Sequence, residues 1–336
     1  MGSRGYFLHR APDRKCVLTR QIFGSFRHNA GPLKPFATRV PLSHFLLLGL
    51  ICLTWAGNFI VSAWVVQQIQ PLSFTVTRFA AVLLLLAPLL KLPERDQWGR
   101  LLLTCWCMGG VHFALLFVAL SRSNDVSSIA LLMQVYIPMS TLMAVLFLGE
   151  RIGWRTTSGI LIAFGGVLVM GLDPLVLAQL DVLALVLLAA LALAIGTMLM
   201  RRLKGISVLN FQAWNALLSL PLLIALAMVF DQAPMPVAEV IAKPTVLGAI
   251  AYSAIGASIV GHGGFYWLIQ RHEVNKVTPY LLLVPVLAVV LGIVFWGDRP
   301  GPRLMIGGGM VLGGVLWITL RMRFRKKRTP PQPPSA

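Results

Sequence analysis

The sequence predicts an all-α integral membrane protein in which ten transmembrane helices form two inverted five-helix repeats. Apolar residues make up 57% of the chain and charged residues only 12%, whereas a typical soluble domain carries about 25% charge. A similar short string also occurs twice between apolar stretches, at 149–155 and 297–303. An internal repeat of this length indicates a duplicated architecture, and in an apolar chain it is typical of a secondary transporter.

The repeat extends beyond the two strings, because further residues match at nearly the same spacing. The matched pairs are Gly159 with Gly307, Gly166 with Gly314, and Pro138 with Pro285. Each repeat holds an odd number of spans, so the second repeat must enter the membrane in the opposite sense. This geometry allows two halves to exchange conformations around a midplane site.

Ten stretches are long enough to cross the hydrocarbon core, which takes about 20 residues. They are continuously apolar, whereas a barrel strand would alternate, so we expect helices. The stretches run over 42–66, 71–92, 99–121, 126–148, 155–171, 182–200, 206–230, 245–270, 275–296 and 303–320. The expected units are a basic tail at 1–41, a first repeat at 42–171, a second repeat at 172–320, and a basic, proline-rich tail at 321–336.

The net charge of +18 is arranged as in a membrane protein and not as in a nucleic-acid-binding one. Most of the 29 Lys and Arg residues fall in the tails and in the even-numbered connections, on one side of the membrane. The positive-inside rule then places both termini in the cytoplasm, with anionic lipid headgroups as partners of these charges. Residues 1–40 hold no apolar run long enough for a signal peptide, and a translation start near Val40 is an alternative account of them.

Four cysteines do not show the spacing of a disulfide framework or a metal site. They are Cys16, Cys52, Cys105 and Cys107. Cys105 and Cys107 lie two apart on a helix and so face different directions. We expect no disulfide, no metal site and no cofactor.

Five segments carry a resemblance to a known family. They are Trp55-Ala-Gly-Asn58-Phe59, Arg78-Phe79, Leu148-Gly149-Glu150-Arg151, Ser258-Ile-Val-Gly261 and Leu283-Val284-Pro285-Val286. Through these segments and the duplication, residues 42–320 resemble the EamA family of the drug/metabolite transporter (DMT) superfamily. The last two segments resemble the branch that exports amino-acid metabolites, although this chain has His112 and His262 where that branch usually has Gln and Tyr.

The resemblance implies two EamA repeats and efflux of a small metabolite, an amino acid or a derivative, across the bacterial inner membrane. It implies a secondary active transporter that works by alternating access and is coupled to protons, not an enzyme. Export of cationic drugs or other solutes is the alternative. A polytopic membrane enzyme or a sensor is disfavoured, because the sequence holds no convergent set of acids, bases or metal ligands.

Two histidines are the candidates for proton coupling. All eleven acids lie near span ends, in connections or in tails, so no mid-membrane carboxylate can carry a proton. His112 and His262 lie inside spans at comparable places in the two repeats. Histidine titrates at about pH 6.5 when unperturbed, so either one could couple a proton to substrate movement. The alternative is a neutral histidine that is hydrogen-bonded between helices.

Arg78 is a basic residue inside a predicted span, seven residues from its start. An arginine at a helix centre costs about 2.5–3.5 kcal/mol on insertion scales, so it normally has a partner. Its planar guanidinium could bind a substrate carboxylate. A structural anchor that pairs with helix carbonyls is favoured, because the family resemblance includes this arginine across varied substrates.

Uncharged polar and aromatic residues add further candidates for a substrate site, with interhelical hydrogen bonding as the alternative role. They are Asn58, Gln134, Tyr136, Trp214, Asn215 and Tyr280. Pro138 and Pro285 cannot donate to the carbonyls of the preceding turn, so each kinks its helix and frees an acceptor. We expect the midplane site at these two broken helices.

The acids of the repeated strings are expected to shape turns. Glu150 and Asp298 follow helix C-termini, an unfavourable place for an anion, and Arg151 and Arg299 come directly after them. A local ion pair at each turn is the expected arrangement. Gly309 and Gly313 have the spacing of close helix packing, within one chain or in a dimer, so a monomer and a homodimer both stay open.

Overall fold

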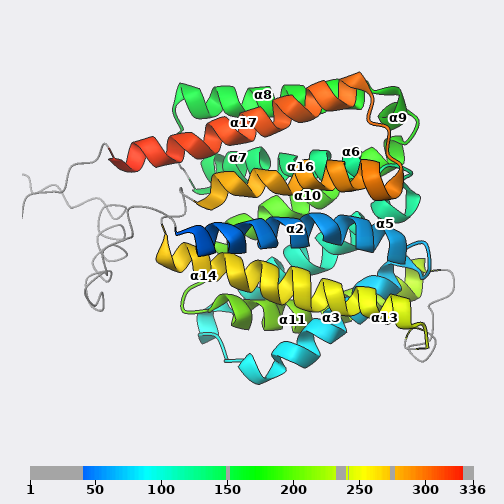
Figure 1. The fold of residues 1–336 in the computed structure, drawn as a ribbon. Helices are drawn as coiled ribbons and strands as arrows, with labels where there is room; N and C mark the ends of the chain where they lie inside the picture. Colours follow the sequence, from blue (N-terminus) through cyan, green and yellow to red (C-terminus); the bar gives the residue numbers. More distant parts are fainter. Residues whose placement is uncertain (1–40, 149–151, 232–239, 241, 273–276, 328–336) are drawn as a thin grey trace, which may run out of the picture. The chain divides into compact units, whose positions relative to one another are not determined.

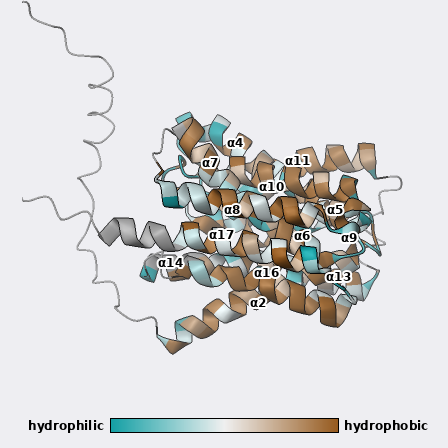
Figure 2. Ribbon diagram, turned by 90° about the horizontal axis from the view of Figure 1, so that it is seen from above, coloured by the Kyte–Doolittle hydropathy of each residue, from teal (hydrophilic) through white to brown (hydrophobic). Residues whose placement is uncertain are grey.

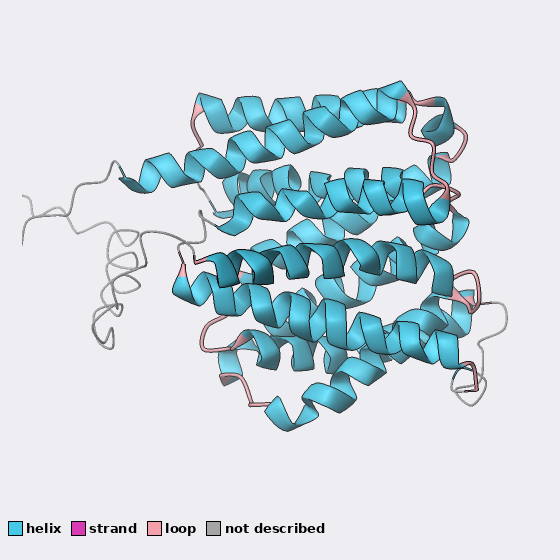
Figure 3. Cartoon of the chain, in the orientation of Figure 1, coloured by secondary structure: helices cyan, strands magenta, loops and turns pink. Residues whose placement is uncertain are grey.

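The computed structural model describes residues 41–148, 152–231, 240, 242–272 and 277–327, and these form helices joined by short connections (Figure 1). Within those ranges there is no strand (Figure 3). Ten helical segments of the described chain are long and apolar enough to cross a membrane. The predicted all-α membrane fold is therefore confirmed.

Five of the ten spans are single α-helices, and a sixth consists of α3 (Pro71–Leu86) followed by the 3₁₀ turn Ala87–Leu89. The single helices are α2 (Leu42–Val65), α8 (Trp154–Gly171), α10 (Leu180–Met200), α11 (Val208–Phe230) and α17 (Pro302–Lys327). The other four are composite, with irregular turns between α-helical parts. They contain α4 (Trp98–Cys105) with α5 (His112–Arg122), α6 (Val126–Leu132) with α7 (Tyr136–Leu148), α13 (Pro244–Ala251) with α14 (Gly264–Arg271), and α16 (Leu283–Leu291).

Large apolar side chains lie on the outside of the helices, as lipid contact requires. Leu84, Leu168 and Met228 are each more than 70% exposed, and Figure 2 shows apolar residues along the outer helices α11 and α13. Lipid tails are as apolar as leucine, so such side chains cost nothing in the hydrocarbon core. The helices must therefore be held together by packing and by hydrogen bonds.

The span ends define two faces. The basic face holds the start of α2 and the connections at 90–94 and 201–207, on the left in Figure 1. Its cationic side chains include Lys91, Arg95, Arg201, Arg202 and Lys204. The opposite face holds the connections at 66–70, 123–125, 172–179 and 297–301. Its acids are Asp125, Asp173, Asp181, Asp231 and Asp298.

Repeat-matched glycines join α8 to α17, which lie side by side in Figure 1. A Cβ on Gly166 would stand 2.5 Å from the Gly307 carbonyl oxygen, and one on Gly314 would stand 2.6 Å from that of Gly159. Gly166 thus packs against the repeat counterpart of Gly159, and Gly159 packs against the repeat counterpart of Gly166, as an inverted repeat with a two-fold axis requires. A Cβ on Gly309 or on Gly313 would meet no atom within 4 Å, so this close packing uses other glycines than the expected pair.

Both prolines singled out in the sequence follow a disturbed stretch of helix. The 3₁₀ turn Met133–Val135 ends shortly before Pro138, and the 3₁₀ stretch Thr278–Leu282 ends shortly before Pro285. Proline lacks an N–H and its ring clashes with the preceding turn, so the backbone tightens there. The expected helix breaks are present in both repeats.

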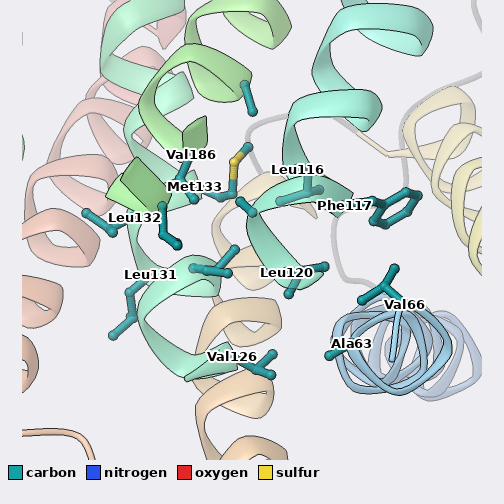
Figure 4. Packing of buried hydrophobic residues seen from close by; sticks show 14 of the residues in the cluster. Ala63, Val66, Leu116, Phe117, Leu120, Val126, Leu131, Leu132, Met133 and Val186 are labelled. Carbon is teal, nitrogen blue, oxygen red and sulfur yellow. The ribbon is translucent and has the colours of Figure 1, made fainter. Parts of the chain in front are cut away.

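The largest apolar core fills the half of the bundle next to the opposite face. Figure 4 shows Phe117, Leu120, Val126, Leu132 and Val186 packed together, and each is at most 2% exposed. These residues come from the late part of α5, from α6 and from the early part of α10.

Carboxylates on the opposite face cap helices that are distant in the sequence. Asp231, at the end of α11, accepts hydrogen bonds from the backbone N–H of Ser73 at 2.8 Å and from its hydroxyl at 2.7 Å. Asp173 accepts from the backbone N–H of Leu304 at 3.1 Å. Helix N-termini carry unpaired N–H groups and a positive dipole end, so each aspartate fixes the start of a span.

Asp298 departs from the expected ion pair with Arg299. Its carboxylate accepts hydrogen bonds from the Ser127 N–H at 2.8 Å, the Ser127 hydroxyl at 2.6 Å and the Val126 N–H at 3.3 Å. The free N–H groups at the start of α6 attract the anion more strongly than an exposed arginine does. The predicted ion pair with Arg299 is therefore wrong for Asp298. Glu150 and Arg151 lie outside the described residues.

Candidate functional site

A cavity of about 330 Å³ lies among α3, α5, α10, α11 and the eighth span. Its polar wall consists of Arg78, His112, Gln212, Asn215, Ser258 and His262. Its apolar wall includes Phe79, Met108, Phe113, Phe211 and Phe265. Met200 and Val208 also line it, and they end α10 and begin α11, so this central cavity extends to the basic face.

Arg78 lies in the central cavity with its charge unpaired. Its side chain is 3% exposed, and neither Nε nor Nη1 has a hydrogen-bond partner among the described residues. The guanidinium carbon stands 4.6 Å from the centre of the Phe113 ring and 5.5 Å from that of Phe117. The expected pairing with helix carbonyls is therefore wrong.

The aromatic contacts satisfy Arg78 only in part. A desolvated cation over an aromatic face gains about 2 kcal/mol, whereas a buried charge without hydrogen bonds costs several. None of the residues that line the cavity is an acid. The site is therefore short of one negative charge, and an anionic group of a ligand would supply it.

His112 points into the cavity from the junction of α5 with an irregular stretch. The preceding residues Trp106–Val111 form a π-helical stretch, a form that frequently marks functional sites. The ring nitrogen Nδ1 lies 3.0 Å from the carbonyl oxygen of Ala189 on α10. This hydrogen bond fixes the ring between the third and sixth spans, which belong to different repeats.

His262 is held differently in the eighth span, through a hydrogen bond within its own helix. It lies in the π-helical stretch Tyr252–Gly263, and its Nδ1 is 2.9 Å from the carbonyl oxygen of Ala257. The Trp55 indole packs edge-on against the imidazole at 5.1 Å and donates to the same carbonyl. A Cβ on Gly261 would stand 2.3 Å from the Trp55 Nε1, so glycine is required for this contact.

The two hydrogen bonds determine which nitrogen of each ring carries a proton. A carbonyl oxygen only accepts, so Nδ1 of His112 and Nδ1 of His262 must donate. In the neutral ring the lone pair is then on Nε2. No described residue makes a hydrogen bond to Nε2 of either ring. Each histidine can thus take up a proton, or accept a hydrogen bond, at Nε2.

Asn215 is the one uncharged candidate from the sequence that the structure places on this cavity, and Gln212 is a residue that the sequence analysis missed. It is 7% exposed, and its Oδ1 has no hydrogen-bond partner within the described chain. Gly109 makes room for it, because a Cβ there would stand 2.5 Å from this oxygen. Gln212 lies three residues earlier on the same face of α11. Two polar residues at helical spacing in an apolar span were the available signal.

Several predicted site residues lie away from the cavity. Asn58 accepts a hydrogen bond from the Ser253 hydroxyl at 2.8 Å. The Trp214 indole donates to the Lys91 carbonyl at 2.9 Å. Tyr280 is 39% exposed and packs against another aromatic ring. The residues of the fourth and ninth spans, Gln134, Tyr136, Pro138 and Pro285, do not line the cavity either. The broken helices therefore do not form the central site in this conformation.

Asp125 lies outside the spans and has a perturbed pKa. It caps α6 through the N–H groups of Ser127 and Ser128, next to Asp298. Burial, together with the neighbouring Asp298 carboxylate, raises the pKa of Asp125 to about 6. Two carboxylates thus share one helix N-terminus on the opposite face.

Comparison with known proteins identifies the family. The EamA-like transporter family matches residues 42–172 and again residues 182–320. This chain belongs to the EamA-like transporter family. It is therefore a multi-pass membrane transporter whose family domain occurs twice, in agreement with the repeat in the sequence and with the ten spans.

Curated relatives cover most of this EamA transporter. An uncharacterized transporter of Archaeoglobus fulgidus is 26% identical over 84% of this chain and 100% of its own length. A probable amino-acid metabolite efflux pump of Escherichia coli K12 is 26% identical over 82% of this chain and 95% of its own. A probable terminal-alkyne amino-acid exporter of Streptantibioticus cattleyicolor is 29% identical over 59% of this chain and 65% of its own.

A crystal structure also matches the fold. It superimposes with a TM-score of 0.57 at 19% identity, over 84% of this chain and 99% of the other. At that identity the likeness concerns the arrangement of helices alone.

Proposed function

We propose that this protein exports an amino acid or an amino-acid derivative across the inner membrane, in exchange for protons and by alternating access. The observation that carries the proposal is the unpaired Arg78 guanidinium in a cavity that also holds two histidines with free Nε2 atoms. The names of the relatives from Escherichia coli and Streptantibioticus cattleyicolor support the same substrate class.

The cavity offers a partner for each end of a zwitterion. Arg78 can hold a carboxylate through two parallel, charge-assisted hydrogen bonds. The Asn215 Oδ1 and a histidine Nε2 can accept from an ammonium group. The volume of about 330 Å³ suits one small molecule. A cationic drug is disfavoured, because it would meet a buried guanidinium and no lining carboxylate.

Proton exchange follows from competition at Nε2. A neutral imidazole accepts a hydrogen bond from the substrate ammonium, whereas an imidazolium repels it. Substrate binding on one side therefore requires that the histidine gives up its proton, and protonation on the other side favours substrate release. His112 belongs to the first repeat and His262 to the second, so each repeat contributes one histidine to the cavity.

The charge distribution supports the orientation on which the proposed direction depends. The positive-inside rule places the basic face and both termini in the cytoplasm. The central cavity extends to that face, since Met200 and Val208 line it. Substrate then enters from the cytoplasm and leaves at the opposite face.

Counterflow in proteoliposomes tests the proposal, with amino acids and O-acyl-serine-like metabolites as solutes and with or without a pH gradient. We expect saturable exchange of a zwitterion that the gradient accelerates. Arg78→Gln should weaken the apparent affinity by about tenfold or more, as expected for a lost charge-assisted pair. The double variant His112→Gln/His262→Gln should keep exchange but lose the acceleration.

Tyr280→Phe is the matched control, because Tyr280 was a predicted site residue that lies away from the cavity. It should behave as the native protein does. Exchange of cationic drugs in preference to amino acids would refute the substrate class. Gradient-driven exchange that persists in the double histidine variant would refute the coupling.

A further inference from the structure

A second cavity, of about 640 Å³, lies among α3, α5, α10 and α11. The third span lines it with Val111, Ala114, Val118 and Arg122, which recur at helical spacing and so form one stripe on that span. None of these four residues lines the central cavity. Val111 is 37% exposed and Phe230 on α11 is 68% exposed, and exposed side chains within a span contact lipid. This cavity, the lateral groove, is therefore open to the bilayer.

The lateral groove is polar at one end and apolar along the rest. Gln70, Ser121, Arg122 and Asp231 line its end at the opposite face, and every other lining residue is apolar. From Val111 to Arg122 the third span rises by about 16 Å, at 1.5 Å per residue. The hydrocarbon core is about 30 Å thick, so this is the depth of one leaflet. A polar end at the interface and an apolar length of one leaflet match the shape of a phospholipid.

Asp231 has a free carboxylate oxygen at the polar end of the groove. Its Oδ2 accepts both hydrogen bonds from Ser73, and its Oδ1 accepts none from the described residues. The side chain is only 6% exposed, and it forms no ion pair within the described chain. A carboxylate removed from water in this way is stabilised by a cationic partner. An ammonium group in the groove would be such a partner.

Arg122 carries the complementary charge at the same end. Its ion pair with Asp181, at 3.4 Å, joins two side chains that are each more than half exposed. Such an exposed pair contributes little, so the guanidinium can bind a phosphate instead at small cost. A lipid with a net negative charge would approach two carboxylates here, Asp181 and Asp231. The charges therefore favour a headgroup that contains both a phosphate and an ammonium.

We propose that the lateral groove is a binding site for a phospholipid with a primary ammonium in its headgroup. Arg122 binds the phosphate, Asp231 binds the ammonium, and one acyl chain lies along the stripe on the third span. The site does not depend on what the central cavity transports, because the two cavities share no lining residue. A water-filled route for a solute is disfavoured, since the groove offers no polar side chain beyond its end at the opposite face.

Native mass spectrometry tests the site. The protein is reconstituted in vesicles of equal parts phosphatidylethanolamine, phosphatidylglycerol and phosphatidylcholine, extracted in a mild detergent, and analysed for retained lipid. We expect one phosphatidylethanolamine per chain, in about tenfold preference over the other two lipids, which is the effect of one charge-assisted hydrogen bond. Phosphatidylglycerol has no ammonium, and the trimethylated ammonium of phosphatidylcholine cannot donate a hydrogen bond to Asp231.

Two tryptophan variants test the place of the lipid. Val118→Trp fills the groove and should lower the retained phosphatidylethanolamine by about tenfold. Leu84→Trp is the matched control, because Leu84 is 79% exposed on α3 but does not line the groove. It should retain as much lipid as the native protein does. Equal losses in the two variants would overturn the site.

Two polar variants test the headgroup. Asp231→Asn keeps an oxygen that accepts from Ser73 but loses the charge, so a lipid should still be retained without the preference for phosphatidylethanolamine. Arg122→Gln changes an exposed side chain, which leaves the fold intact, and should weaken the retention of all three lipids.

Three results would overturn the proposal. The first is equal retention of the three lipids by the native protein. The second is an unchanged preference in Asp231→Asn together with native retention in Arg122→Gln. The third is release of the bound lipid by glycerophosphoethanolamine, the headgroup without acyl chains, which would indicate a site for a water-soluble ligand.

Discussion

Asp298 is predicted to stabilise the protein through α6 and not through Arg299. Asp298→Ala removes the acceptor of three hydrogen bonds at the start of α6, two from Ser127 and one from Val126. The side chain is 5% exposed, so water does not replace it fully. Arg299→Ala removes an exposed side chain that forms no ion pair with this carboxylate in the described part of the chain.

The structure gives the size of the effect. Hydrogen bonds to a charged group contribute about 1.5–3 kcal/mol each. Two features reduce the sum: Asp125 also accepts from the Ser127 N–H, at 3.1 Å, and removal of one carboxylate relieves its repulsion with the other. We expect a net loss of about 2–4 kcal/mol for Asp298→Ala and less than about 0.5 kcal/mol for Arg299→Ala.

Unfolding in mixed micelles with increasing SDS measures both variants. The readout is thiol reactivity, because Cys52 and Cys105 are fully buried and become reactive only when the helices separate. Gly292→Ala is an independent check, since its Cβ would stand 2.3 Å from an Asp298 carboxylate oxygen. It should destabilise the protein although Asp298 is intact. Equal losses for Asp298→Ala and Arg299→Ala would refute the reasoning and restore the local ion pair.

Three further predictions concern the opposite face and the helix pair α8–α17. The pKa of Asp125 is raised to about 6 in the folded protein, so the free energy of unfolding should fall by up to about 3 kcal/mol as pH rises from about 4 to about 6. Asp125→Asn keeps the cap of α6 and should remove this pH dependence. An unchanged pH dependence in Asp125→Asn would show that another group causes it. Gly166→Val should separate α8 from α17 and lower the midpoint of SDS unfolding. Gly309→Val should not lower it, because a Cβ at Gly309 meets no atom within 4 Å. Similar midpoints for the two variants would count against the glycine packing between α8 and α17. Asp231→Ala should cost about 1–2 kcal/mol through the lost cap of α3, and faster hydrogen exchange at the start of α3 is the local sign to look for.

Much of the fold could be predicted from the sequence. Hydropathy along the chain indicates the spans, and the repeated spacing of glycines indicates the duplication. Gly159 and Gly307 recur in register, and both are used where α8 packs against α17, Gly159 against Gly314 and Gly307 against Gly166. The partner of Asp298 could not be predicted in the same way. Arg299 is its neighbour in the chain, whereas Ser127 lies in the other repeat and is brought near only by folding.

The candidate site was predicted residue by residue but not as a set. Arg78, His112 and His262 were singled out because polar groups are costly in hydrocarbon, and the structure places all three on one cavity. The prediction that the site lies at the two prolines was wrong. A proline indicates where a helix is irregular, but it does not indicate where a cavity lies between helices. The π-helical stretches next to both histidines have no comparable sequence signal, because no residue type enforces that geometry as proline enforces a kink.

The glycine contact between α8 and α17 has a consequence for the alternating-access cycle proposed here. If the two repeats exchange conformations, Gly159–Gly314 becomes Gly307–Gly166, which is the other half of the same contact. The exchange therefore maps this helix pair onto itself. The pair can stay unchanged in the inward-facing and outward-facing states and serve as a fulcrum, while the helices around the central cavity move about it.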